Sequence, residues 1–289
     1  MFSWTSEFLP VDGATLRLLR AASNTSAHHR PSILFVHGFT DNAMYFSRAA
    51  AALADTHEIF AYDARGHGRS TRFSDETSGR RFDDELRAAD LLRVLDAFSA
   101  SGLRKPIAIG HSMGGSTIAN AAALRPDAFR ALILEDPAWW EAGDIPADER
   151  DAAAKSLRAR TADWRKWLVA LQAADDAASL AMSQAGNAIW SLEDATLSRN
   201  ARREFDPVLF DHYPPPDAPW RKAVAAWRCP ALLLLGSERN AIITPQRADE
   251  ACAIHSAVRW VQIAGAGHSI RFDRFDEYMS AVRQFLAQV

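Results

Sequence analysis

This sequence has little cysteine, no long apolar run and little net charge, and each shortage excludes a class of protein. Among 289 residues there are only two cysteines, Cys229 and Cys252, which lie far apart and match no metal-binding spacing. We interpret both as reduced core residues, which argues against a disulfide framework or a zinc site. No apolar run reaches the roughly 18 residues of a membrane-spanning helix. A net charge of −3 gives no electrostatic reason to expect nucleic acid or an anionic membrane as partner.

The start of the sequence also lacks the marks of a secretion signal. Residues 1–10 include Glu7 and several polar side chains, with neither a basic start nor an apolar stretch after it. We therefore expect a cytoplasmic protein, a monomer or a homodimer, whose partner is a small-molecule substrate.

What the sequence does contain is a repeated alternation of apolar runs and helix-like stretches. Continuous apolar runs at 32–36, 59–62, 107–109 and 231–235 are typical of strands that are buried on both faces. Each run is followed by a stretch with apolar residues at helical spacing. The alternation predicts an α/β protein with a mostly parallel sheet and helices on both faces. Near the start, Asp-Gly at 12–13 between two apolar runs predicts a β-hairpin.

The alternation stops in the middle of the chain. Residues 139–220 are rich in alanine, tryptophan and charge, show no strand pattern, and close with three consecutive prolines at 214–216. We expect this stretch to be an inserted helical cap, and we expect residues 1–138 and 221–289 to form the core.

A serine motif stands at the centre of the predicted sheet. Residues 110–114 read Gly-His-Ser-Met-Gly between a predicted strand and a helix-like stretch, which is the context of a nucleophile elbow. A sharp turn projects the hydroxyl of Ser112 away from the sheet, and the flanking glycines tolerate the tight backbone. A serine hydroxyl needs a base within hydrogen-bond reach. His268, in a glycine-bounded loop after the last predicted strand, is our candidate base.

Four motifs in this order resemble those of the α/β-hydrolase family. They are His-Gly-Phe at 37–39, the Asp-x-Arg-Gly-His-Gly-x-Ser pattern at 63–70, the elbow with its extra glycine at 110–115, and Gly-Ala-Gly-His at 265–268. The resemblance implies an eight-stranded, mostly parallel sheet with a helical cap inserted over the active site. It also implies that the 63–70 motif is structural.

The resemblance further assigns an oxyanion hole and a pocket. The backbone N–H groups of Phe39 and Met113 would stabilise the negative charge that develops on the substrate oxygen. Tryptophans in and beside the inserted stretch favour an apolar or aromatic substrate, although they could equally form the core of a cap. The residues we expect to line the pocket are His37, Gly38, Trp139 and Trp140.

The third member of a catalytic triad has two candidates. The family commonly carries an aspartate a few residues after the seventh strand, but this sequence has Arg239 there, and a cation cannot orient a histidine base. Some family members carry the acid after the sixth strand, where Asp136 stands. We favour Asp136 because a short side chain at a strand end is held rigidly, and Glu238 is the alternative acid.

These residues predict a serine hydrolase that needs neither a metal nor an organic cofactor. The reaction would be cleavage of a carboxylic ester, lactones and thioesters included, through an acyl-enzyme on Ser112. Two alternatives stay open: a carbon–carbon bond hydrolase of the meta-cleavage type, and a non-catalytic ligand-binding member of the fold.

Overall fold

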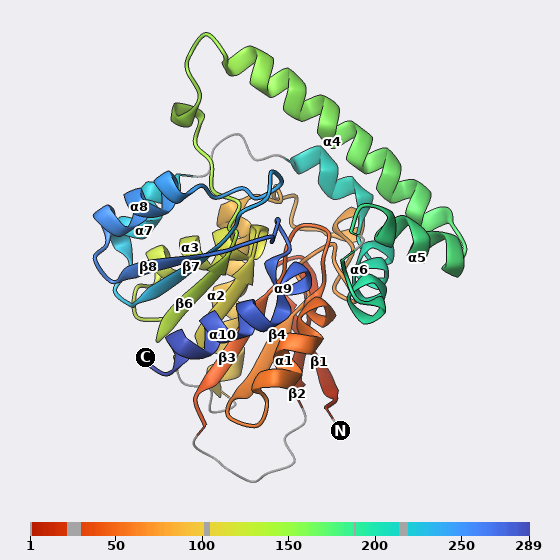
Figure 1. The fold of residues 1–289 in the computed structure, drawn as a ribbon. Coiled ribbons are helices and arrows are strands. Elements are labelled where there is room, and N and C mark those ends of the chain that lie inside the picture. The colour runs from red at the N-terminus through yellow and green to blue at the C-terminus, as the bar shows by residue number, and fades with distance from the viewer. Residues whose placement is uncertain (1, 22–29, 101–104, 188, 214–218) are drawn as a thin grey trace.

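The computed structural model describes residues 2–21, 30–100, 105–187, 189–213 and 219–289. Its centre is an eight-stranded sheet in the order β1-β2-β4-β3-β5-β6-β7-β8 (Figure 1). The strands are β1 (Trp4–Val11), β2 (Ala14–Ala21), β3 (Ser32–Val36), β4 (Glu58–Tyr62), β5 (Ile107–His111), β6 (Ala131–Glu135), β7 (Ala231–Gly236) and β8 (Val258–Ile263). Only the β1–β2 and β2–β4 pairs are antiparallel. The mostly parallel sheet expected from the sequence is confirmed, and the predicted hairpin turns at Asp12-Gly13.

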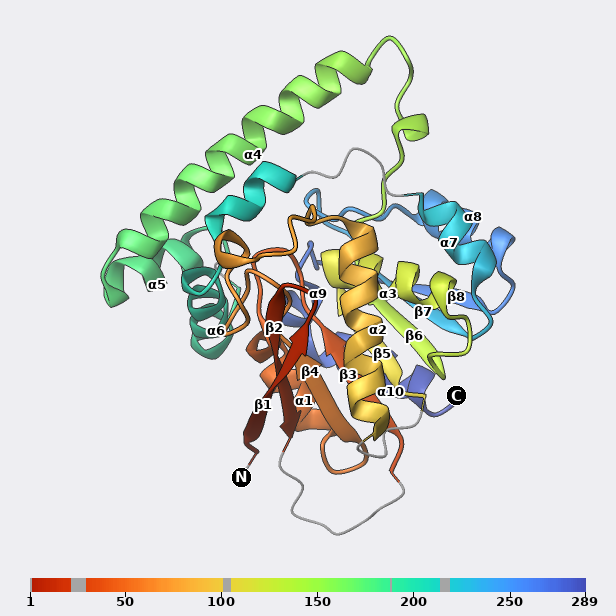
Figure 2. The same cartoon turned by 180° about the vertical axis from the view of Figure 1, so that it is seen from behind.

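Helices cover both faces of this sheet, as the alternating pattern predicted. On one face lie α2 (Asp84–Ala100), α3 (Met113–Leu124), α7 (Trp220–Ala226) and α8 (Pro245–Ile254), and α2 and α3 stand in front of the strands in Figure 2. On the other face lie α1 (Ser47–Leu53), α9 (Ile270–Asp273) and α10 (Phe275–Leu286). Successive side chains of a strand point to opposite faces, so Ala108 joins the first apolar layer while Ile107 and Ile109 join the second.

The stretch between β6 and β7 is helical and adds no strand to the sheet in its described part. It contains η3 (Ala142–Asp144), α4 (Arg150–Ala173), α5 (Asp176–Ala185), α6 (Leu192–Arg203) and the short 3₁₀ helix η4 (Pro207–His212). Figures 1 and 2 show α4 beyond the sheet and its two helix layers, with α5 and α6 beside its far end. We call residues 139–220 the inserted segment.

Both ends of the inserted segment are anchored in the core. The rings of Trp139 and Trp220 stack with centroids 5.0 Å apart and planes 5° from parallel, and both belong to the apolar layer formed with α2 and α3. The helices that project away from the core therefore begin several residues after Trp139 and end before Trp220.

The remaining differences from the sequence-based expectations are small. The chain between β3 and β4 forms a 3₁₀ turn, η1 (Ala43–Phe46), followed by α1, and a second short 3₁₀ helix, η2 (Phe73–Asp75), lies before α2. Strand β6 ends at Glu135, directly before Asp136. None of the described helices combines the length and apolar character that a bilayer crossing requires.

Candidate active site

Ser112 lies on a strained turn between β5 and α3. Its backbone angles are φ 51° and ψ −115°, a region that a residue with a side chain rarely adopts, and such strain gathers at functional sites. The turn also requires close approach of the backbone, because a Cβ on Gly114 would lie 2.0 Å from the carbonyl oxygen of Val36. Ser112 is 8% exposed. The structure therefore gives residues 110–114 the geometry expected of a nucleophile elbow.

Asp136 and His268 are joined by a hydrogen bond. The Nδ1 atom of His268 lies 2.6 Å from Oδ2 of Asp136, and the side chain of Asp136 is fully buried. Asp136 also accepts hydrogen bonds from the backbone N–H groups of Ile242 and Ile243 at 2.9–3.0 Å. These contacts fix the position of the Asp136 carboxylate, which accepts the hydrogen bond from Nδ1 of His268.

The amides that hold Asp136 come from the loop after β7, where the resemblance noted in the sequence implied the commoner position of the acid. Glu238 and Arg239 are exposed in this loop, and the carboxylate of Glu238 accepts a hydrogen bond from its neighbour Ser237 at 3.3 Å. The geometry therefore favours Asp136 over Glu238 as the partner of the histidine. The loop contributes backbone donors in place of a carboxylate.

The surroundings of His268 favour its protonated form. Burial lowers the pKa of His268, but the hydrogen bond and charge of Asp136, together with the charges of Asp41 and Glu135, outweigh it, so the pKa is raised above its ordinary value. Among the described residues the hydroxyl of Ser112 makes no hydrogen bond to His268, although both side chains line one cavity. Catalytic hydrogen bonds are often long without substrate and shorten when it binds.

A buried polar network lies beneath His268. Glu135 accepts hydrogen bonds from the backbone N–H and the Nη1 of Arg271, at 3.0 and 2.6 Å. Asp41 accepts one from His111 at 2.9 Å, and Nε2 of His111 lies 3.0 Å from the carbonyl oxygen of His268. Burial raises the pKa of Asp41. The hydrogen bond from His111 and the charges of His111 and Arg271 lower it by more, so the pKa lies well below its usual range.

This network ties the backbone of the histidine loop to the end of β6. The sequence analysis did not identify Asp41, His111 and Arg271 as partners in this network. No local sequence pattern marks these partners. The side chains of Asp41, His111, Glu135 and Arg271 meet only because the order of the strands brings distant segments together.

Phe39 and Met113, whose amides we expect in the oxyanion hole, border the same cavity as Ser112 and His268. Met113 is the first residue of α3, a position where the N–H group has no partner within the helix. The carbonyl oxygen of Phe39 lies 2.5 Å from Nε2 of His67, whose Nδ1 lies 2.7 Å from the carbonyl oxygen of Arg65. His67 thereby connects the Phe39 loop to the loop that follows β4.

His37 and Gly38 do not have the pocket position that we expected. His37 is 1% exposed, and burial lowers its pKa to about 4, so the ring is neutral. Its Nε2 accepts a hydrogen bond from the N–H of Ala64 at 3.0 Å, and its Nδ1 donates to the carbonyl oxygen of Gly38 at 2.8 Å. The N–H of Gly38 donates to Asp41 at 3.1 Å. All these groups are used within the fold, and neither residue is part of the lining of the cavity at Ser112.

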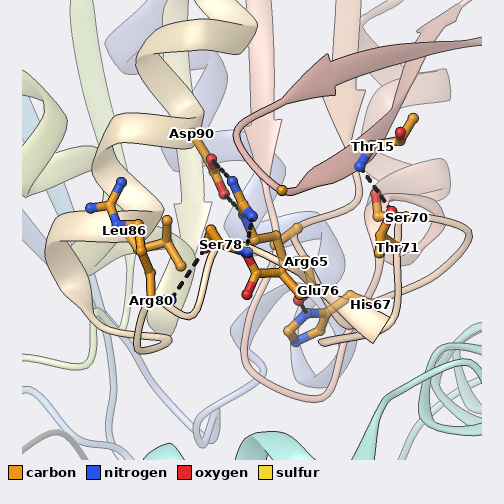
Figure 3. A network of polar contacts seen from close by, with 12 residues as sticks. Thr15, Arg65, His67, Ser70, Thr71, Glu76, Ser78, Arg80, Leu86 and Asp90 are labelled. Atoms are coloured by element: carbon orange, nitrogen blue, oxygen red, sulfur yellow. Dashed lines mark hydrogen bonds and ion pairs between the residues drawn. The ribbon is translucent and has the colours of Figure 1, made fainter. Parts of the chain in front are cut away.

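The 63–70 motif is structural, as expected. Arg65 is buried and forms two hydrogen bonds with Asp90 of α2, at 2.7 and 3.0 Å, and one with Glu76 at 3.0 Å (Figure 3). Asp63 accepts hydrogen bonds from the backbone N–H groups of Ala43 and Arg69. These charge-assisted bonds fix the loops on either side of β4.

The cavity at Ser112 measures about 260 Å³ and draws its walls from both parts of the molecule. The core contributes, besides Ser112 and His268, residues that include Phe39, Tyr45 and Asn240. Trp164, Arg202 and Tyr213 of the inserted segment complete the walls. The inserted segment therefore covers part of the site that holds Ser112.

A second cavity of about 310 Å³ adjoins the first, since the two share lining residues such as Phe39, Met113 and Tyr213. Trp139 and Trp140 line this second cavity. Trp139 is only 1% exposed and stacks on Trp220, so it belongs to the core as well as to a cavity wall. The structure therefore supports both alternatives for the tryptophans, as pocket walls and as part of an apolar core.

With this geometry in view, comparison with known proteins identifies the class. Residues 33–281 match the model of the alpha/beta hydrolase family, and the chain belongs to that family.

Individual relatives extend over most of the chain. Esterase YbfF of Escherichia coli is 28% identical over 269 residues, which cover 93% of this chain and 98% of that protein. N-formylmaleamate deformylase of Pseudomonas putida is 26% identical over 260 residues, with 88% of each chain covered. The crystal structure of E-2-(acetamidomethylene)succinate hydrolase superposes with a TM-score of 0.75 at 17% identity, over 99% of this chain and 100% of that one. This last likeness supports the fold.

Proposed function

We propose that this protein is a serine hydrolase that cleaves a carboxylic ester through an acyl-enzyme. One observation carries the proposal: His268 is hydrogen-bonded to the buried Asp136 at 2.6 Å and borders the same cavity as Ser112 on its strained turn. A nucleophile, a base and an orienting acid are the groups that acyl transfer needs. The similarity to Esterase YbfF over nearly the whole chain supports the choice of an ester.

In this mechanism each group has one task. The Oγ of Ser112 attacks the ester carbonyl carbon while Nε2 of His268 takes the hydroxyl proton, and Asp136 stabilises the resulting imidazolium. The N–H groups of Phe39 and Met113 donate to the oxyanion. His268 gives its proton to the leaving alcohol. It then activates a water molecule, which hydrolyses the acyl-serine and releases the acid.

The substrate that fits is a small molecule with an apolar part. Aromatic side chains from both parts of the molecule line the two adjoining cavities, among them Phe39, Trp164 and Tyr213. Apolar and aromatic walls with a few polar groups are typical of small-molecule sites. A lactone or thioester would present the same carbonyl to Ser112.

The decisive test is removal of the nucleophile. Ser112→Ala is expected to lower kcat on a 4-nitrophenyl ester by about three to six orders of magnitude while the fold is kept, because the covalent step is lost. Circular dichroism checks the fold, and labelling by a fluorophosphonate should modify the wild type and not the variant. Retention of more than a tenth of the activity would refute the assignment. An unlabelled, inactive wild type would favour a non-catalytic ligand-binding protein.

Hydrolysis of a carbon–carbon bond is the second candidate. It would use the same Ser112 and His268, and it needs polar groups that hold a dienol acid. Arg202 and Asn240 in the cavity wall are such groups. Comparing turnover of a ring-cleavage dienoate with that of a 4-nitrophenyl ester separates the two: a higher kcat/KM on the dienoate would select the second candidate.

A further inference from the structure

Arg202 is a cation in the wall of the catalytic cavity that has no ion-pair partner among the described residues. It is the second-last residue of α6 in the inserted segment, and it borders the same cavity as Ser112 and His268. Its Nε and Nη1 atoms are buried and have no hydrogen-bond partner, and in the described part of the chain it forms no ion pair. Leaving the donors of a charged group unsatisfied in a buried site is costly.

The other charged side chains of this cavity are compensated within the fold. Asp41 accepts a hydrogen bond from His111 at 2.9 Å and lies 3.9 Å from the guanidinium of Arg271. His268 is paired with Asp136. Among the described residues that line the cavity, Arg202 is therefore the charged side chain without an ion-pair partner.

Neighbouring arginines of α6 behave differently. Both Arg199 and Arg203 form ion pairs with Asp176 of α5. Arg202 instead lies over aromatic rings, with its guanidinium carbon 5.0 Å from the ring centre of Trp167 and 6.0 Å from that of Trp190. These contacts stabilise the cation, but an aromatic ring supplies no oxygen acceptor for its N–H donors.

We propose that Arg202 binds a carboxylate at the far end of the acyl group, so that the preferred substrates are monoesters of short dicarboxylic acids. This inference rests on the proposed function. A guanidinium presents parallel donors that match both oxygens of a carboxylate. Ser112 and Arg202 share a cavity of about 260 Å³, which suits a short acyl chain with the ester at one end and the charge at the other.

The test compares two esters that differ only in this charge. Mono-4-nitrophenyl glutarate and 4-nitrophenyl pentanoate have acyl chains of equal length, and spontaneous hydrolysis is subtracted for both. The wild type is expected to have the higher kcat/KM on the glutarate. Arg202→Met should reduce the glutarate-to-pentanoate ratio by about 10- to 100-fold, as for loss of a charged hydrogen-bond donor. Arg202→Lys, which keeps the charge but loses the two-pronged geometry, should give an intermediate ratio.

Two control variants locate the effect. Arg199→Gln removes a positive charge from the same helix outside the cavity and should leave the ratio unchanged. Arg160→Gln removes an arginine that lines the adjoining cavity and should also leave it unchanged. If the role of Arg202 were purely structural, Arg202→Met would lower the melting temperature and reduce kcat/KM by the same factor on both esters. The proposal would be overturned if Arg202→Met left the glutarate-to-pentanoate ratio of kcat/KM unchanged. It would also be overturned if only Arg160→Gln reduced that ratio.

A measurement on the wild type covers the case in which Arg202→Met does not fold. Free glutarate should inhibit hydrolysis of the pentanoate ester more strongly than free pentanoate does, and equal inhibition by the two acids would overturn the proposal. The outcome for the broader function is separate, because it is read from Ser112→Ala. If that variant abolishes cleavage of the pentanoate ester and the wild type shows no preference for the glutarate, only the role of Arg202 fails.

Discussion

The core and the inserted segment differ in how far their side chains are buried and hydrogen-bonded. Strands β3, β5, β6 and β7 are buried along their whole length, and Asp136 at the end of β6 accepts hydrogen bonds from Ile242, Ile243 and His268. In the 24-residue helix α4 only Thr161, Leu168 and Leu171 are buried. The inserted segment also contains exposed apolar side chains, such as Ile189 and Leu192, each 64% exposed. The difference indicates that the core fixes the geometry of the reaction, whereas the inserted segment shapes the space for the substrate.

The largest expected effect on kcat comes from replacing Asp136, the proposed triad acid in the core. Asp136→Asn is expected to lower kcat by about 10²–10⁴, because the amide cannot hold His268 in the required tautomer. Glu238→Gln, which changes an exposed carboxylate, should cost about tenfold or less. Both variants are measured on one ester at saturating substrate. The opposite ranking would transfer the role of the acid to Glu238.

Stability should separate the two regions as well. Arg271→Met leaves Glu135 buried without its partner and should lower the free energy of unfolding by about 3–5 kcal/mol. The matched variant in the inserted segment is Arg165→Met, which breaks an exposed ion pair with Asp211, and such pairs contribute about 0–1 kcal/mol. Urea denaturation measures both. Equal losses would contradict the distinction between a tightly coupled core and a loosely coupled insertion.

The smallest expected effect is a shift in pH dependence. His268 must be neutral to accept a proton, and its raised pKa should place the acid limb of kcat/KM above the ordinary histidine value of about 6.5. Because the folded pKa is raised, the stability that His268 contributes is fully present below about pH 6.5 and is lost as the pH rises through the folded value.

The measurement is a profile of kcat/KM and of unfolding free energy between about pH 5 and 9. In Asp136→Asn the acid limb should move to lower pH, because the main contribution that raises the pKa is removed. An acid limb at or below about pH 6.5 in the wild type would contradict the role of the Asp136 contact.

Much of the fold could be predicted from the sequence because its signals are local. The strands appear as apolar runs and the helices as apolar residues at regular spacing, and both were found to within a few residues. The sharp turn at Ser112 needs glycines at fixed positions, so a five-residue pattern was sufficient to locate it. The lack of strand pattern in residues 139–220 likewise predicted a helical insertion.

What the sequence alone could not decide is which distant groups meet. The choice between Asp136 and Glu238 depends on β6 lying beside β7, since this contact brings the amides of Ile242 and Ile243 onto Asp136. His37 was expected in the pocket because its motif lies near the active site, but packing against the loop after β4 uses both of its ring nitrogens. The position of Arg202 in the wall of the Ser112 cavity, with no ion-pair partner among the described residues, likewise becomes visible only in the tertiary structure. Periodicity and turn chemistry act over a few residues, whereas the partners of a buried polar group come from wherever the chain returns to it.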